Sequence, residues 1–311
     1  MPRHAAVCVA ALLLAACETL GGPRASGSPA PSDAAAPTRS AAPTVRIDPS
    51  VVQPPPGWRR IADIPTARSE VAAAVFRGGV FVIGGFGGGR VVERLGGQPA
   101  SWSRVAELPI EVDHAMAASV DVDGAPGVYV MGGNVNGTAT ARAFRWFGDE
   151  GWREIAAMPA PRSQAAAVAI GSRIYVVGGQ AGGVLVSPTF VYDLASGRWA
   201  TRAPIPTPRD HLAAVALGGR VCAVGGRRLS LDANLASLEC YDPSADRWER
   251  LTDAPTARGG VGAAVVGDRL FFVGGERPTG TFREVEIYDA TARAWSRGPD
   301  LPTPRHGIGV A

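Results

Sequence analysis

The chain has 311 residues, a formal net charge of +3 and an apolar fraction of 46%. That fraction is ample for a hydrophobic core, and the length allows one large domain or two ordinary ones. The small and dispersed charge argues against a nucleic-acid partner. With 40 Gly and 26 Pro, the composition favours many turns and short strands.

Residues 1–16 predict a secretory signal peptide. A short basic start precedes an uncharged apolar run from Ala5 to Ala16, which is too short to span a bilayer. The run ends in Cys17 after Leu14-Ala15-Ala16 and resembles the lipobox of bacterial lipoproteins; the alternative is a buried cysteine that follows alanines by chance. The resemblance implies lipidation of Cys17 and an exported protein anchored to a membrane of the cell envelope, on the outer-membrane or periplasmic side in a Gram-negative cell.

Residues 17–56 predict a disordered tether. From Glu18 to Pro56 the chain consists mainly of Ala, Pro, Ser and Gly. Such a segment cannot bury enough apolar surface to fold. We therefore expect the folded domain to occupy residues 57–311.

A repeat runs from Trp58 to the end of the sequence, with tryptophans at intervals of 44 to 50 residues. A proline follows each tryptophan by seven residues, and an arginine follows five of the six prolines by three residues. Val112 is the exception at the arginine position. The repeated tryptophans are Trp58, Trp102, Trp152, Trp199, Trp248 and Trp295, and Gly-Gly pairs begin at Gly84, Gly132, Gly178, Gly225 and Gly274.

Each repeat predicts four short strands. An Ala/Val stretch precedes an apolar strand that ends in Gly-Gly; a third strand ends in Tyr-Asp, and a fourth begins at the tryptophan. No window has a 3.6-residue apolar periodicity long enough for a helix. Four strands in a repeat of this length are typical of a propeller blade, so we predict an all-β fold.

The order Arg, Gly-Gly, Tyr-Asp, Trp resembles the kelch repeat and implies a kelch-type β-propeller. We predict five complete four-stranded blades plus an incomplete sixth, which takes its outer strand from residues 58–65 and its inner strand from residues 303–311. A five-bladed ring with both ends free is the alternative. Because the two middle strands of the sixth blade are missing, we expect the sequence to be truncated. Blades 1 and 2 are degenerate, with Arg94-Leu95 and Trp146-Phe147 in place of Tyr-Asp.

The repeated arginines are expected to form a circle at one end of the propeller channel. The kelch resemblance implies an anion-receptive face at this position, because guanidinium groups pair well with carboxylates. The alternative, favoured by repetition in nearly every blade, is that the arginines bond to carbonyls between blades; both roles can coexist. These residues are Arg68, Arg162, Arg209, Arg258 and Arg305.

A variable and mostly polar position lies two residues after the arginine and predicts a ligand-facing rim. It holds Glu70, His114, Gln164, His211, Gly260 and Gly307, and His306 lies one residue away from it. A metal site is not expected, because two of the histidines belong to separated blades and no carboxylate pattern accompanies them. No motif implies a cofactor.

The predicted function is a binding module for a protein, an acidic peptide or an anionic glycan, without catalytic residues. All five tyrosines occupy ordinary repeat positions, which argues against the copper site of galactose-oxidase-like kelch enzymes. The alternative is a sugar-processing enzyme of the sialic-acid mutarotase type, in which the arginines, Glu70 and His211 would serve an anionic sugar. Cys222 and Cys240 either form a disulfide, as export would allow, or replace ordinary core residues.

Overall fold

The computed structural model describes residues 57–311. The signal peptide, the lipidated Cys17 and the tether, all predicted for residues 1–56, lie outside the described residues. Within residues 57–311, no helix combines the length and the apolar character needed to cross a membrane.

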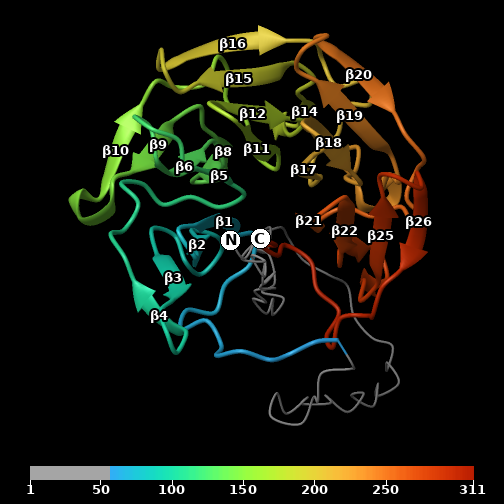
Figure 1. The fold of residues 1–311 in the computed structure, drawn as a ribbon, viewed down its shortest axis with the longest axis horizontal. Coiled ribbons are helices and arrows are strands. Elements are labelled where there is room, and N and C mark those ends of the chain that lie inside the picture. Colours follow the sequence, from blue (N-terminus) through green and yellow to red (C-terminus); the bar gives the residue numbers. More distant parts are fainter. Residues whose placement is uncertain (1–56) are drawn as a thin grey trace, which may run out of the picture.

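Five four-stranded antiparallel sheets are arranged around a common axis as the blades of a propeller (Figure 1). Blade 1 contains β1 (Ala72–Phe76), β2 (Gly79–Ile83), β3 (Val92–Gly96) and β4 (Ser101–Arg104). Blade 2 contains β5 (Met116–Val120), β6 (Gly127–Met131), β9 (Ala143–Trp146) and β10 (Trp152–Ile155). Blade 3 contains β11 (Ala166–Ile170), β12 (Arg173–Val177), β15 (Thr189–Asp193) and β16 (Arg198–Arg202). Blade 4 contains β17 (Ala213–Leu217), β18 (Arg220–Val224), β19 (Leu238–Asp242) and β20 (Arg247–Arg250). Blade 5 contains β21 (Gly262–Val266), β22 (Arg269–Val273), β25 (Val285–Asp289) and β26 (Ala294–Arg297).

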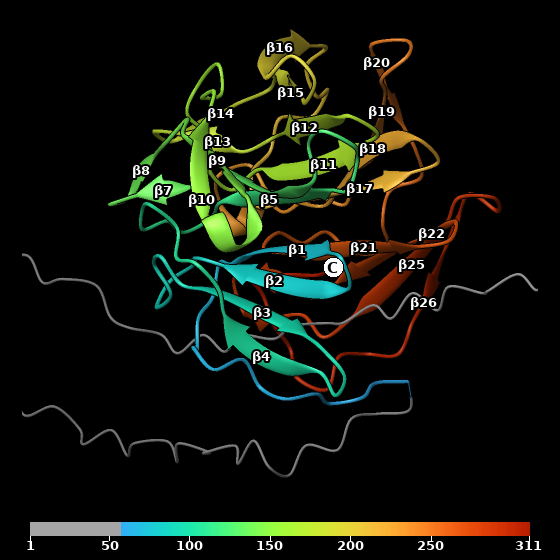
Figure 2. The ribbon, with the colours of Figure 1, turned by 60° about the vertical axis from the view of Figure 1, so that its left-hand side comes forward.

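Smaller elements lie in the connections within blades (Figure 2). Three of these connections, between the second and third strands of a blade, form short hairpins: β7 (Asn134–Val135) with β8 (Thr138–Ala139), β13 (Gln180–Ala181) with β14 (Val184–Leu185), and β23 (Glu276–Arg277) with β24 (Gly280–Thr281). The 3₁₀ turns are η1 (Gly148–Glu150) and η2 (Leu231–Ala233).

The hydrophobic core lies between blades rather than within one sheet. The cluster between blades 4 and 5, for example, packs Val215 and Leu238 against Phe272 and Tyr288. Equivalent clusters fill the interfaces between blades 1 and 2, 2 and 3, and 3 and 4. Burial of these side chains on both faces of the sheets explains why the second strands are continuous apolar runs.

The terminal segments close the ring. The prediction of five complete four-stranded blades is confirmed, but the outer and inner strands expected of a sixth blade do not form, because neither 58–65 nor 303–311 contains a strand. Residues 58–65 and 303–311 lie between blades 1 and 5, and no strand among the described residues joins them into a sheet. The segments do not extend freely into solvent, because Ile61 and Ile64 pack on blade 1 and Trp58 and Ile308 pack on blade 5.

The six repeated tryptophans link neighbouring blades. Each indole Nε1 donates a hydrogen bond to a backbone carbonyl of the preceding repeat, at distances of 2.7 to 3.1 Å. Trp58 follows the same rule across the ends of the chain, since it donates to Pro299 O of blade 5. This set of six bonds, here called the tryptophan ring, therefore has a member at the sixth position.

Candidate functional site

The repeated arginines are inside the blades, which differs from the expected anion-receptive circle. The side chains of Arg68, Arg162, Arg209 and Arg258 are at most 2% exposed, and Arg305 is half-buried. Their guanidinium groups donate to carbonyls of their own blade rather than between blades; Arg209, for example, reaches Ala223 O at 3.0 Å. The blades are joined instead through the arginine backbone, as when Arg258 O accepts the Gly226 N–H of blade 4 at 2.9 Å.

A threonine and a glutamate complete each buried arginine in three blades. In blade 4 the carboxylate of Glu239 lies 2.5 Å from Arg209 and accepts the Thr207 hydroxyl at 2.7 Å. The same set recurs as Thr66, Glu93 and Arg68 in blade 1, and as Thr256, Glu286 and Arg258 in blade 5. Because a buried charge is tolerable only when it is paired and hydrogen-bonded, these arginines are structural.

Blade 2 replaces the whole set with apolar residues, and blade 3 replaces all of it except the arginine. The equivalent residues of blade 2 are Ile110, Val112 and Phe144, which explains the missing arginine. Blade 3 keeps Arg162, but Phe190 occupies the glutamate position and its ring lies 4.1 Å from the guanidinium. Burial without a carboxylate partner lowers the pKa of Arg162 to about 9.

The predicted ligand-facing rim forms a closed ring of backbone hydrogen bonds at one end of the axis. Each N–H donates to the carbonyl of the equivalent residue in the preceding repeat, at 2.8 to 3.2 Å, and Glu70 closes the circle by donating to Gly307. The members are Glu70, His114, Gln164, His211, Gly260 and Gly307. We call this set the inner ring, and the end of the propeller that carries it the ring face.

All six inner-ring residues have left-handed backbone conformations, with φ between 50° and 62°. Glycine adopts this conformation without steric cost, whereas other residues are strained by about 1 kcal/mol or more. Two positions hold glycine, but four keep a large polar side chain. Retention of side chains where glycine would be more stable points to a role for those side chains.

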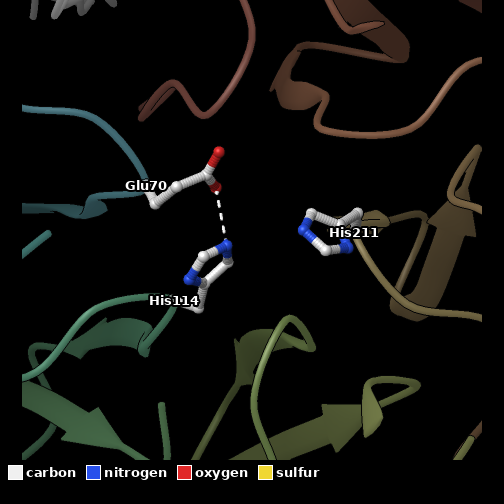
Figure 3. A group of neighbouring side chains, drawn as sticks. All are labelled: Glu70, His114 and His211. Carbon is white, nitrogen blue, oxygen red and sulfur yellow. Dashed lines mark ion pairs between the residues drawn. The ribbon is translucent and has the colours of Figure 1, made fainter. Parts of the chain in front are cut away.

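His114 lies between two carboxylates. Its Nδ1 is 2.6 Å from Asp113 Oδ1 and its Nε2 is 3.3 Å from Glu70 Oε2 (Figure 3). The Asp113 carboxylate also accepts the side-chain amide of Asn134 at 3.0 Å. The imidazole is thus held in one orientation, with Nε2 directed at Glu70 and only 9% of the side chain exposed.

His211 lies opposite, with its ring 5.2 Å from that of His114. Its Nε2 accepts a hydrogen bond of 2.9 Å from the Arg227 guanidinium, which also binds Glu276. The Nδ1 of His211 faces Asp210 Oδ1 at 3.6 Å, and neither atom has a closer hydrogen-bond partner among residues 57–311. Figure 3 shows that His114 and His211 each present a ring nitrogen toward the Glu70 side.

A second set of residues surrounds the inner ring and was missed by the sequence reasoning. Each follows a Gly-Gly pair directly and forms a β-bridge with the residue that precedes an inner-ring position. The sequence did contain a signal for them: the residue directly after each Gly-Gly pair differs from blade to blade, although the two glycines are the same in every blade. These residues are Phe86, Asn134, Gln180, Arg227 and Glu276, here called the loop ring.

The ring face is rich in carboxylates. Four carboxylates contact either an inner-ring histidine or the guanidinium of Arg227, which is bound to His211; they belong to Glu70, Asp113, Asp210 and Glu276. His306 adds a further imidazole, 3.6 Å from Glu276 and 3.8 Å from Glu70. Because these carboxylates outnumber the guanidinium, this cluster attracts cations rather than anions when the histidines are neutral.

A hollow opens at the opposite end of blades 3 and 4, away from the ring face. It has a volume of about 580 Å³ and is lined by the turns at Gly171, Gly219 and Ser244. Its carboxylate, Asp242, accepts hydrogen bonds from the Ser244 hydroxyl and backbone, which lower its pKa. That carboxylate therefore stabilises a turn, and the ring face is the better candidate site.

Cys222 and Cys240 form a disulfide in blade 4. They are directly opposite each other on β18 and β19, and both are fully buried. Of the two alternatives drawn from the sequence, the structure has the disulfide.

A closed arrangement of four-stranded blades, joined by the tryptophan ring and the inner ring, defines a kelch-type β-propeller. Residues 113–311 match the family model described as "KLHDC2/KLHL20/DRC7 Kelch-repeats domain", and the chain belongs to this family. The solved structure titled "Structure of YjhT" is similar in fold, with a TM-score of 0.68 and 16% sequence identity over 79% of this chain and 87% of that chain. No curated protein matches the chain significantly.

Proposed function

We propose that the protein is an interaction module that binds a partner protein through its ring face. The kelch propeller fold supports an interaction role at a coarse level. Binding through the ring face in particular is supported by the loops that begin at the loop-ring residues, because three of these loops expose a large apolar side chain. Phe86 is 53% exposed, Val184 67% and Leu229 48%.

Two of these apolar side chains, Phe86 and Leu229, lie beside the polar groups of the ring face. Phe86 contacts His114 edge to face, with ring centroids 5.3 Å apart. Leu229 lies two residues after Arg227 and, like the inner-ring residues, has a positive φ, at 63°. Large apolar side chains that are exposed on neighbouring loops of one face offer apolar contacts to a partner. The carboxylates nearby favour a partner with a basic group over the acidic peptide or anionic glycan expected from the sequence.

Site-specific photo-cross-linking in the native host tests this proposal. A photoreactive residue at Phe86 or Leu229 should capture the same partner, whereas one at Ser244, exposed at the opposite end, should not. With the partner identified, the F86S/L229S variant should bind it at least about tenfold more weakly, equivalent to about 1.4 kcal/mol. Capture from Ser244 with equal yield would contradict the proposal.

A second candidate function, sugar mutarotation, is favoured by one contact. Glu70 and His114 are 3.3 Å apart and Asp113 orients the imidazole, an arrangement that supplies a general acid and a general base. If this function holds, the protein accelerates equilibration of sialic acid anomers in NMR spectra, and Glu70→Gln reduces the rate at least about a hundredfold. Rates equal to those in buffer would eliminate it.

A further inference from the structure

We propose that Glu70, His114 and His211 bind one divalent transition-metal ion of the zinc type at the centre of the ring face. One carboxylate oxygen and one imidazole nitrogen from each histidine lie within 4.8 Å of one another. Imidazole and carboxylate groups are the usual ligands of zinc when a coordination position remains open for water or a ligand. The site lies within the partner surface proposed above, but zinc binding is measured without a partner, so one proposal can fail while the other holds.

The hydrogen bonding of His114 leaves a place for a cation. Its Nδ1 donates to Asp113 at 2.6 Å, so Nε2 of the neutral ring carries a lone pair that faces the Glu70 carboxylate at 3.3 Å. Two acceptors in such contact need a proton or a cation between them. Ligand atoms about 2.0–2.1 Å from a tetrahedral zinc ion are roughly 3.3 Å apart, which matches this separation.

His211 has a related but looser arrangement in blade 4, because its Nδ1 lies 3.6 Å from Asp210 Oδ1, too far for a hydrogen bond. Asp210 faces its Nδ1, and Nε2 accepts from Arg227, so the Nε2 lone pair already holds a positively charged group. Metal-binding histidines usually have a carboxylate or carbonyl at the second ring nitrogen, which fixes the tautomer. A metal ion would displace Arg227 from Nε2, and the guanidinium would keep its contact with Glu276.

The geometry needs only a small adjustment. His211 must approach the Glu70–His114 pair by roughly 1.5 Å to complete a zinc site, a distance within reach of side-chain rotation. The four carboxylates of the ring face favour the bound cation.

Zinc titration of the chelator-treated full chain by calorimetry, with Co²⁺ absorption spectra in parallel, tests the site. We expect one equivalent of Zn²⁺ and the visible bands of tetrahedral Co²⁺. His114→Gly and His211→Gly should each weaken binding at least tenfold, and Asp113→Asn about 10–100-fold. Gln164→Gly is the matched control, because Gln164 has the same backbone conformation but no metal-binding side chain; its zinc affinity should be unchanged. Any zinc bound by cysteine thiols outside the site is the same in every variant, so differences between variants report on the site.

Two further measurements distinguish metal binding from a structural role. Glycine relieves backbone strain, so the two histidine variants should melt no lower than the unsubstituted protein without metal, yet lose the Zn²⁺-induced rise in Tm. Arg227→Ala should tighten zinc binding by removing a competing cation. Absence of stoichiometric binding, or equal affinity in the histidine variants, would overturn the proposal. A tight site would also occupy the Glu70 and His114 atoms that mutarotation requires.

Discussion

The buried charge of Arg209 shows that the interior of a blade is stable only with a matching set of residues, and that no single residue can be judged alone. Arg209, Glu239 and Thr207 bond to one another with the two charged side chains at most 1% exposed. Blade 2 holds Val112 and Phe144 in the same places and needs no polar partner. Both solutions are physically sound, because an ion pair and a well-packed apolar group are often similar in stability. A mixture of the two leaves a charge unpaired.

Glu239→Gln should therefore lower the free energy of unfolding by about 3–5 kcal/mol, since it leaves the Arg209 charge buried without its counter-charge. Glu249→Gln in the same blade is the control, because that carboxylate is 50% exposed and should cost less than about 1 kcal/mol. Urea denaturation measures both. The combined T207I/R209V/E239F variant, which copies blade 2, should lose less stability than Glu239→Gln alone. A loss below 1 kcal/mol for Glu239→Gln would contradict a structural arginine.

The sequence predicts the phase of a residue in the repeat but not the direction of its side chain. Periodicity correctly placed Arg162 and Gln164 at equivalent positions of every blade. It could not show that the arginine faces the blade interior, because that depends on carbonyls such as Val176 O that the fold brings near it. The closeness of Glu70, His114 and His211 was missed for a related reason. Residues of blades 1, 2 and 4 are distant in sequence, but the inner ring has a small radius.

At the scale of the strand, the Gly-Gly pair explains how each blade is joined to the next. The second glycine of the blade 4 pair, Gly226, has φ of 99°, and a Cβ there would lie 2.8 Å from Asp210 O. Its N–H donates to Arg258 O of blade 5. A side chain at Gly226 would push the loop away from Asp210 and break the β-bridge between Asp210 and Arg227. The Gly-Gly pairs, which are the best predictor of blades in the sequence, therefore also hold the loop-ring residues in place.

The strands were more predictable than the connections between them. The apolar run Val221–Val224 and the Tyr-Asp turn located β18 and β19 because burial on both faces leaves a direct signal in composition. The hairpins β13–β14 and β23–β24 left no such signal, since two-residue strands carry too little periodicity. These connections carry Val184 and lie beside the candidate site, so the sequence described the scaffold better than the binding surface.

At the scale of the whole molecule, the five complete blades occupy five of six equivalent positions around the axis. The inner ring and the tryptophan ring each contain six hydrogen bonds, and the sixth in each is supplied by a terminal segment. These segments also cover the flanks of blades 1 and 5 with Ile64 and Ile308. Ring closure therefore depends on short segments without a sheet of their own, and the two flanks should be the least stable interfaces of the propeller.

Removing residues 303–311 should consequently open the ring at one place. The deletion removes Arg305 O, the acceptor for the Gly275 N–H, together with the inner-ring bond from Glu70 to Gly307 and the buried side chain of Ile308. We expect Tm to fall by roughly 5–10 °C, as for a loss of a few kcal/mol in a domain of this size. Hydrogen exchange locates the effect: the amides of Glu70 and Gly275 should exchange faster, while those of β12 in blade 3 should keep their protection. Equal acceleration in blade 3 would mean that the propeller unfolds as one unit, and unchanged exchange at Glu70 would show that the terminal segment does not close the ring.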